Sequence, residues 1–322
     1  MRSGLRHLAL NLRHHTAPLF GHSRGNRIAA DPAMPRMIGA MDPLPARVRL
    51  VIFDLDGVVY RGSEPIAGAA ALVRWLHERG VAVRFATNNS MVAREGYVTR
   101  LGSMGIETSI DEIVTSSSAT VEHLRRHAPD VRRVLAIGAE GMRDELGAAG
   151  FEVEMAGDVA PESPGGPLAG AYDAVIVGLD PGFDYARLSA AMSAVAAGAR
   201  FIATNADARY PTPAGFVPGA GSIVAALAAA SGATPEVIGK PEPAMFRAIL
   251  EASGVDAAEA VVIGDNPASD VIGARRAGCA AILVLTGVAD ADSVAALDAE
   301  SVPHAVAADP AAVRALLEPR VS

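Results

Sequence analysis

Four short groups of polar residues in this chain could do chemistry together, because each follows an apolar run. They are Asp54 with Asp56, Thr87-Asn88-Asn89, Gly239-Lys240-Pro241, and Asp265 with Asp270. Taken singly, such groups are also typical of turns and helix N-caps. Taken together, they supply carboxylates for a hard cation such as Mg²⁺ and a carboxylate that can attack phosphorus. They also supply a hydroxyl, amides and an ammonium for phosphoryl oxygens, so the joint pattern favours phosphoryl chemistry over four unrelated turns.

Lys240 is the single lysine in a chain with 28 lysine and arginine residues. Chance under a GC-rich codon usage is one explanation. The other is a site that requires a compact ammonium group, which a planar guanidinium cannot replace. The second explanation predicts a functional role for this residue.

The composition is that of a globular protein and excludes several classes. Half of the 322 residues are hydrophobic, 20% are charged, and the formal net charge is −8, which argues against a general nucleic-acid surface. No apolar run approaches the ~20 residues of a membrane span. The one cysteine, Cys279, excludes a disulfide scaffold and a cysteine-based zinc cluster.

The N-terminal segment differs from the rest of the chain. Residues 1–41 contain six arginines and a single acidic residue, Asp31, without sustained hydrophobic periodicity. A transit peptide and a mis-assigned start codon both remain open explanations. We expect residues 1–47 to form a disordered extension outside the fold.

From residue 48 the chain alternates between strand-like and helix-like segments. The expected strands are 48–53, 81–86, 134–137, 174–177, 201–203, 260–263 and 281–285, and the expected helices are 67–79, 117–127, 185–197, 222–230, 244–252 and 268–277. This alternation predicts an α/β fold with a Rossmann-like parallel sheet. In such sheets the functional residues lie beyond the carboxyl ends of the strands.

The spacing of the groups also predicts a second domain. Only 30 positions separate Gly57 from Thr87, whereas 153 separate Thr87 from Lys240. The long interval has room for at least three further strand–helix pairs. We therefore predict an inserted α/β cap at 130–234, between two parts of the core at 48–129 and 235–322.

The four groups resemble the four motifs of the haloacid dehalogenase superfamily, and the resemblance covers the chain from about residue 48 onward. The Thr87-Asn88-Asn89 form, with Ala203-Thr204-Asn205-Ala206-Asp207 and Pro218-Gly219-Ala220-Gly221-Ser222, is similar to the branch of NagD-like, 4-nitrophenyl and phosphoglycolate phosphatases. One departure is visible. Asn266-Pro267-Ala268-Ser269 stands where this branch often has Arg-Leu-Asp-Thr, so assignment to one named phosphatase is weakened.

The resemblance implies a Mg²⁺-dependent phosphatase that hydrolyses small phosphate monoesters through an aspartyl-phosphate. It implies that Asp54 is the nucleophile and Asp56 the general acid and base. Magnesium would be held by the Asp54 carboxylate, the Asp56 main-chain carbonyl and Asp265, with Asp270 orienting its waters. Phosphoryl binding is expected from Thr87, Asn88, Asn89 and Lys240.

Substrate choice is expected to come from the cap, because the four motifs handle only the phosphoryl group. The turn containing Asn205 and Asp207 and the following Pro- and Gly-rich loop are the candidates. Arg209 could pair with a substrate carboxylate or be a solvated surface arginine. We expect a small phosphorylated metabolite as partner, no nucleic acid or membrane, and a cytoplasmic location; a homodimer formed through the cap is left open.

Other functions fit the residues less well. A nucleotide-binding oxidoreductase requires Gly-x-Gly-x-x-Gly, and Gly219-Ala220-Gly221 lacks the third glycine. Pro241 replaces the Ser or Thr that follows the lysine of a P-loop. A dehalogenase has no need of Asp56, and a phosphosugar mutase carries its cap after the first motif. The remaining alternative is a catalytically slow, phosphate-ester-binding regulator of the same fold.

Overall fold

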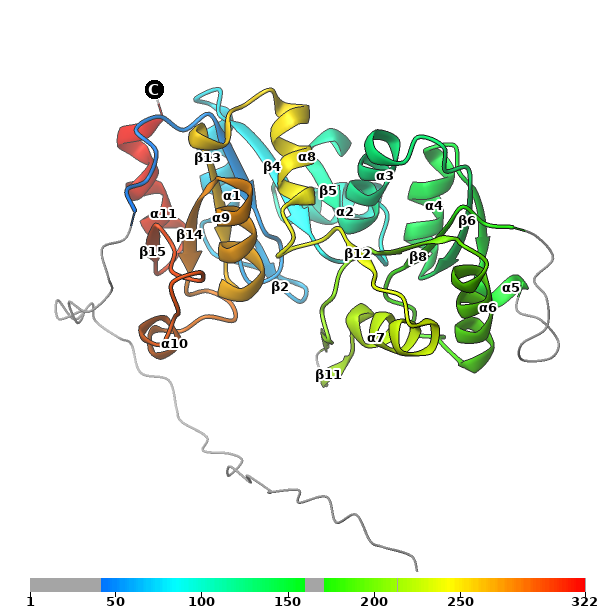
Figure 1. Cartoon of the computed structure of the whole chain (residues 1–322). Helices are drawn as coiled ribbons and strands as arrows, with labels where there is room; N and C mark the ends of the chain where they lie inside the picture. Colours follow the sequence, from blue (N-terminus) through cyan, green and yellow to red (C-terminus); the bar gives the residue numbers. More distant parts are fainter. Residues whose placement is uncertain (1–41, 160–170, 213, 322) are drawn as a thin grey trace, which may run out of the picture. The chain divides into compact units, whose positions relative to one another are not determined.

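The computed structural model describes residues 42–159, 171–212 and 214–321 (Figure 1). The strands are β1 (Leu50–Phe53), β2 (Tyr60–Arg61), β3 (Glu64–Pro65), β4 (Ala82–Thr87), β5 (Ile113–Thr115), β6 (Arg133–Ile137), β7 (Glu152–Met155), β8 (Ala174–Val177), β9 (Arg200–Ala203), β10 (Arg209–Thr212), β11 (Gly215–Pro218), β12 (Glu236–Val237), β13 (Ala260–Gly264), β14 (Ala280–Val284) and β15 (Ala305–Ala307). The helices are α1 (Ala69–His77), α2 (Arg94–Ser103), α3 (Ser116–His127), α4 (Glu140–Ala148), α5 (Ala156–Val159), α6 (Tyr185–Ala196), α7 (Ala220–Ser231), α8 (Ala244–Ser253), α9 (Ile272–Ala277), α10 (Ala291–Ala295) and α11 (Pro310–Leu317), and the turn η3 (Pro267–Val271) is π-helical. Among these helices, none combines the length and the apolar character needed to cross a bilayer.

The first sheet is a parallel six-stranded sheet in the order β15-β14-β13-β1-β4-β5. All four residues of β1 are buried, as expected for a central strand covered on both faces. Val51 and Phe53 pack with residues of α1, α2 and α11, whereas Leu50 and Ile52 pack with residues of α3, α8 and α9. The period of two along the strand therefore separates the two helical layers, and the predicted parallel α/β fold is confirmed.

The second sheet is inserted between Thr87 and Lys240 and has the parallel order β12-β9-β8-β6-β7. Residues of α6 and α7 cover one of its faces, and the other face belongs to the same buried cluster as α3, α4 and α8. The predicted inserted α/β cap is thus confirmed. The boundaries at 129/130 and 234/235 stay predictions, and the strands of this sheet run from Arg133 to Val237. Below, "cap" means this sheet with α4 to α7 and the hairpin β10–β11, which we call the cap hairpin.

Most of the predicted N-terminal extension, residues 1–41, lies outside the described residues. The part that is described, 42–47, contacts the first domain. Leu44 packs against the buried cluster beneath α1 and α11, and Asp42 pairs with Arg275 at 3.3 Å. The main chain then enters the first sheet, where the Val48 N–H donates to the Arg320 carbonyl at 2.9 Å.

Candidate active site

The carboxyl ends of β13, β1 and β4, which are neighbours in the first sheet, bring the polar groups together. Asp54 follows β1, and its N–H donates to the Ile263 carbonyl of β13 at 2.8 Å. Asp265 follows β13, and Thr87 is the last residue of β4. Neighbouring parallel strands end at the same edge of a sheet, which explains why residues far apart in the chain meet here.

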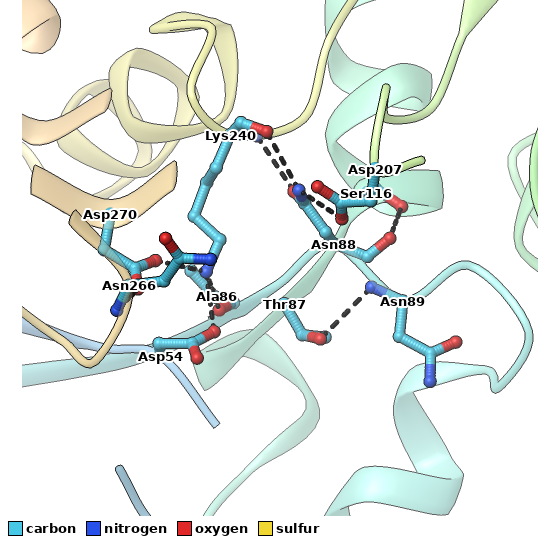
Figure 2. Close-up of polar contacts among 10 residues, drawn as sticks. All are labelled: Asp54, Ala86, Thr87, Asn88, Asn89, Ser116, Asp207, Lys240, Asn266 and Asp270. Atoms are coloured by element: carbon cyan, nitrogen blue, oxygen red, sulfur yellow. Dashed lines mark hydrogen bonds and ion pairs between the residues drawn. The ribbon is translucent and has the colours of Figure 1, made fainter. Parts of the chain in front are cut away.

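Lys240 reaches this edge from the loop after β12 and is 3% exposed. Its ammonium donates to Asp54 Oδ1 at 2.6 Å, to Asp270 Oδ1 at 2.7 Å and to the Ala86 carbonyl at 3.3 Å (Figure 2). Three donors thus meet three acceptors, an arrangement that suits an ammonium and not the planar fork of an arginine. This contact set supports the functional explanation for the single lysine.

The surrounding carboxylates keep Lys240 charged. Burial by itself lowers the pKa of an ammonium, but Asp270 and Asp54 outweigh it and raise the pKa of Lys240 above its ordinary value. Each of these side chains is therefore balanced by the others. Removing one would leave a buried charge without its counter-charge, which costs more than the loss of a surface ion pair.

Three carboxylates converge beside this lysine. One oxygen each of Asp54, Asp265 and Asp270 lies within 4.8 Å of the others. Burial raises the pKa of Asp54 well above its ordinary value, although Lys240 opposes the shift. Burial, with the nearby Asp270, raises the pKa of Asp265 to about 7. Three carboxylates face a single ammonium here, so their negative charge is not fully balanced. A hard divalent cation would bind such oxygen ligands and stabilise the ionised form of the carboxylates.

The protein uses both oxygens of Asp270. Oδ1 accepts from Lys240, and Oδ2 accepts from the Asn266 N–H at 3.1 Å. The π-helical turn η3 makes the second contact by bringing residue 270 back onto residue 266. In contrast, Asp54 Oδ2 and Asp265 Oδ1 have no hydrogen-bond partner among the described residues. Asp265 Oδ1 is therefore available to a cation and Asp54 Oδ2 to a cation or a substrate, whereas both oxygens of Asp270 are bonded within the protein.

Asp56 differs from these three carboxylates because its side chain is open to solvent. It lies before the hairpin β2–β3 and forms an isolated bridge with Tyr60. Partial enclosure by the protein still raises its pKa, while Arg100 and Lys240 oppose the shift. An accessible carboxyl with a raised pKa is a good candidate for exchanging a proton with a substrate or with water.

Asn88 joins four segments of the chain. Its amide nitrogen donates to the Lys240 carbonyl at 2.9 Å and to Asp207 Oδ2 at 3.0 Å, and its amide oxygen accepts from the Lys240 N–H at 2.9 Å (Figure 2). Its main-chain carbonyl accepts from Asn205 Nδ2 at 2.8 Å and from Ser116 Oγ at 2.7 Å. The side chain expected to bind phosphoryl oxygens is thus bonded to protein at both ends. Its main-chain N–H has no acceptor among the described residues.

Thr87 and Asn89 point in different directions. Thr87 is 5% exposed, and its hydroxyl accepts from the Asn89 N–H at 3.2 Å. Asn89 accepts from the Met91 N–H at 2.8 Å and donates to the Tyr210 hydroxyl of the cap hairpin at 3.4 Å. In Figure 2, Thr87 lies between Asp54 and Asn89. Thr87 is therefore the nearer of the two to the ion pairs, and Asn89 contacts the cap.

The structure treats the three predicted cap residues differently. Asn205 and Asp207 follow β9 and reach the end of β4 through the bonds given above. Arg209 instead places its guanidinium over the Phe216 ring of the cap hairpin, 5.3 Å from the ring centre. Tyr210, the first residue of the predicted cap loop 210–222, contacts the site through Asn89, although the sequence did not single it out within that loop.

The sequence did not point to the loop after β14, residues 286–289. It contacts Asp265 and the turn that contains Gly57. A signal for it was present, because the predicted strand 281–285 ends directly before Thr286-Gly287 at the same edge of the sheet. Its side chains include no acid, base or metal ligand, so the residue types alone do not indicate a role.

Comparison with known proteins agrees with this geometry. Residues 51–152 match the family of haloacid dehalogenase-like hydrolases, and residues 237–312 match a second, HAD-hydrolase-like family. The chain is 34% identical over 255 residues to the 5'-nucleotidase YutF of Bacillus subtilis, covering 79% of this chain and 93% of that protein. It is 33% identical over 252 residues to the acid sugar phosphatase of Staphylococcus saprophyticus, covering 78% and 91%.

Solved structures show the same likeness in three dimensions. The glycerol phosphate phosphatase from Mycobacterium tuberculosis in complex with magnesium superposes with a TM-score of 0.73 at 30% sequence identity. The match covers 84% of this chain and 78% of that one. The likeness therefore covers most of this chain.

Proposed function

The chain belongs to the haloacid dehalogenase-like hydrolases and is a phosphoric monoester hydrolase, and we propose that it acts with Mg²⁺ through an aspartyl-phosphate on Asp54. The observation that carries the proposal is the ammonium of Lys240 held between Asp54 and Asp270. This contact fixes one oxygen of Asp54 and leaves Oδ2 for attack on phosphorus. Asp265, at the end of the next strand, completes the carboxylate set.

In the first step, Asp54 Oδ2 forms a bond to phosphorus while the bond from phosphorus to the ester oxygen breaks. Asp56 is accessible to the substrate and donates a proton to the leaving alkoxide. In the second step, Asp56 takes a proton from a water molecule that attacks phosphorus. The bond to Asp54 then breaks, releasing phosphate and restoring the carboxylate.

The phosphoryl oxygens would be bound by groups that converge at the end of β4. Lys240 supplies the charge, Thr87 a hydroxyl and Asn88 its main-chain N–H. Asp54 and Asp265 would hold the cation, with the main-chain carbonyl of Asp56 as the family resemblance implies. When bound, Mg²⁺ would neutralise negative charge that develops on the phosphoryl oxygens.

Small polar phosphate esters are the substrates we propose. The cap hairpin carries one arginine, Arg209, whose guanidinium packs on Phe216. It also carries one tyrosine, Tyr210, whose hydroxyl contacts Asn89 near the strand ends. The named relatives are a 5'-nucleotidase, an acid sugar phosphatase and a glycerol phosphate phosphatase. Sugars and glycerol are small and rich in hydroxyl groups, which agrees with a polar leaving group. The cytoplasmic location and a homodimer through the cap stay predictions.

Hydrolysis of 4-nitrophenyl phosphate tests this mechanism. Wild-type turnover should require added Mg²⁺ and disappear in EDTA, and Asp54→Asn should lose about three or more powers of ten in kcat. Thr212→Ala, on the cap hairpin, serves as a substitution control. Full activity in EDTA or in Asp54→Asn would disprove the mechanism. Phosphate-ester binding without turnover by wild type would instead favour the regulatory alternative.

A further inference from the structure

The 286–289 loop, which connects β14 to α10, contacts two parts of the active site at once. The Val288 N–H donates to Asp265 Oδ2 at 2.7 Å, and the Ala289 N–H donates to the Asp265 carbonyl at 3.0 Å. The Thr286 hydroxyl donates to the Gly57 carbonyl at 2.6 Å. The loop therefore joins the acid that follows β13 to the turn that carries the residues after Asp54.

Two glycines allow the backbone to pack directly against the Asp265 carboxylate. A Cβ atom on Gly287 would collide with that carboxylate, and so would one on Gly57. At Gly287 the reason for glycine is close approach, whereas Gly57 also has a positive φ of 80°. The carboxylate is thus enclosed by main chain from two loops, which restricts its rotation.

Val288 contributes through its main chain and not its side chain. Its side chain is one of the exposed large hydrophobic groups, with 70% of the residue accessible, while its N–H donates to the carboxylate of Asp265, a residue that is 4% exposed. An exposed valine has no packing reason to be needed here. The local requirement is for an N–H at position 288 and for the absence of a side chain at position 287.

We propose that the 286–289 loop is a positioning element for the divalent cation, acting through Asp265 and Gly57. The inference rests on the function proposed above. Binding Oδ2 to Val288 leaves Asp265 Oδ1 for the cation, and the Thr286 bond holds the turn that follows Asp54 and Asp56. Partners that orient a ligand carboxylate commonly change metal affinity 10- to 100-fold when removed.

Metal binding without substrate tests the proposal on the full chain. Mn²⁺ affinity is measured by electron paramagnetic resonance, and Mg²⁺ affinity by calorimetry. Gly287→Ala and Val288→Pro should weaken the binding about 10-fold or more. The matched controls are Gly147→Ala, where a Cβ meets nothing within 4 Å, and Val288→Ala, which keeps the N–H. Both controls should bind the cation as wild type does.

Thr286 provides a milder test that does not depend on crowding at position 287. Thr286→Val removes the hydroxyl at nearly constant shape, and Thr286→Ser keeps it. We expect several-fold weaker cation binding in the first and wild-type binding in the second. Excess Mg²⁺ should restore much of the kcat of Thr286→Val, which a general loss of folding would not allow.

Two results would be decisive in opposite directions. Folded Thr286→Val, Gly287→Ala and Val288→Pro proteins with wild-type Mn²⁺ affinity would overturn the role of the loop. If Gly287→Ala or Val288→Pro fails to fold, Thr286→Val decides alone. A wild-type protein that binds neither cation would instead overturn the metal dependence proposed above, so the two failures are distinguishable.

Discussion

The carboxylate–lysine cluster (Asp54, Asp265, Asp270 and Lys240) and the cap hairpin both border the site, but they are built in opposite ways. In the cluster, Lys240 and Asp270 are 3% and 1% exposed and bind each other. On the hairpin, Phe216 and Val217 are 69% and 43% exposed. The first region depends on mutual compensation of buried charges, and the second on surface groups with few partners.

This difference suggests how the two regions tolerate change. A substitution in the cluster leaves its partners unbalanced inside the protein, so both chemistry and stability are affected. A substitution on the hairpin leaves no buried group unpaired and, under the proposed function, alters only the surface that a leaving group would meet. Asn88 lies between them, because it binds Lys240 on one side and Asp207 of the cap on the other.

Of the substitutions that test this difference between the cluster and the cap hairpin, Lys240→Arg should have the largest effect on activity. Arginine keeps the charge but cannot place three donors on Asp54, Asp270 and the Ala86 carbonyl, so kcat should fall about 100-fold or more. Steady-state kinetics with 4-nitrophenyl phosphate measures the loss, and circular dichroism checks the fold. Arg143→Lys, on the exposed side of α4, is the reverse substitution and should be silent. Wild-type turnover in Lys240→Arg would instead support codon usage as the explanation for the single lysine.

An intermediate effect is expected for the link between the two regions. Asn88→Ala removes the bonds that hold the Lys240 backbone, and kcat/KM should fall about 10-fold, or ~1.4 kcal/mol in transition-state stabilisation. Asp207→Ala should lower kcat/KM less, because this variant loses only one hydrogen bond to the Asn88 amide. The double variant should show a coupling of about 1 kcal/mol.

The same double-mutant cycle distinguishes two roles for the Asn88 side chain. One is direct binding of phosphoryl oxygens, which the sequence predicts, and the other is support of the Lys240 backbone. Direct binding would raise the inhibition constant of inorganic phosphate in Asn88→Ala and leave the effect of Asp207→Ala additive. If the Asn88 side chain instead supports the Lys240 backbone, Asn88→Ala should lower kcat, and its effect should be energetically coupled to that of Asp207→Ala. Asn88→Asp adds contrast, because a carboxylate cannot donate to the Lys240 carbonyl and would face Asp207 with like charge.

The smallest effects are expected on the cap hairpin. Arg209→Ala should leave the ratio of kcat/KM for phosphoglycolate and glycerol phosphate within about twofold, because its guanidinium packs on Phe216. Tyr210→Phe should change that ratio by about 2- to 10-fold, since its hydroxyl contacts Asn89. Both should hydrolyse 4-nitrophenyl phosphate normally. A selective 10-fold loss with phosphoglycolate in Arg209→Ala would restore the carboxylate-binding role considered for this residue.

Much of the core could be predicted because its pattern is local. The buried runs that become β1, β8 and β13 are each uninterrupted and apolar, so their period and ends can be identified in the chain. Strands β5 and β15, of three residues each, were not predicted from the sequence. The π-helical turn at Asp270 was expected as ordinary helix, since its departure depends on one main-chain contact with Asn266.

The sequence by itself determined which residues stand at the carboxyl edge of the parallel sheet, because a strand's end and the residue after it are set within a few positions. The chemistry of the cluster followed from those residue types. Only the tertiary structure decided which partner each side chain takes. Asn88 binds Lys240 across 152 positions, and Asp265 is oriented by a loop that carries no recognisable functional residue. Arg209 contacts Phe216 because the register of the cap hairpin places the two residues diagonally across its strands. For Asn88 and Asp265, partner choice depends on how distant segments pack, and no local pattern encodes that.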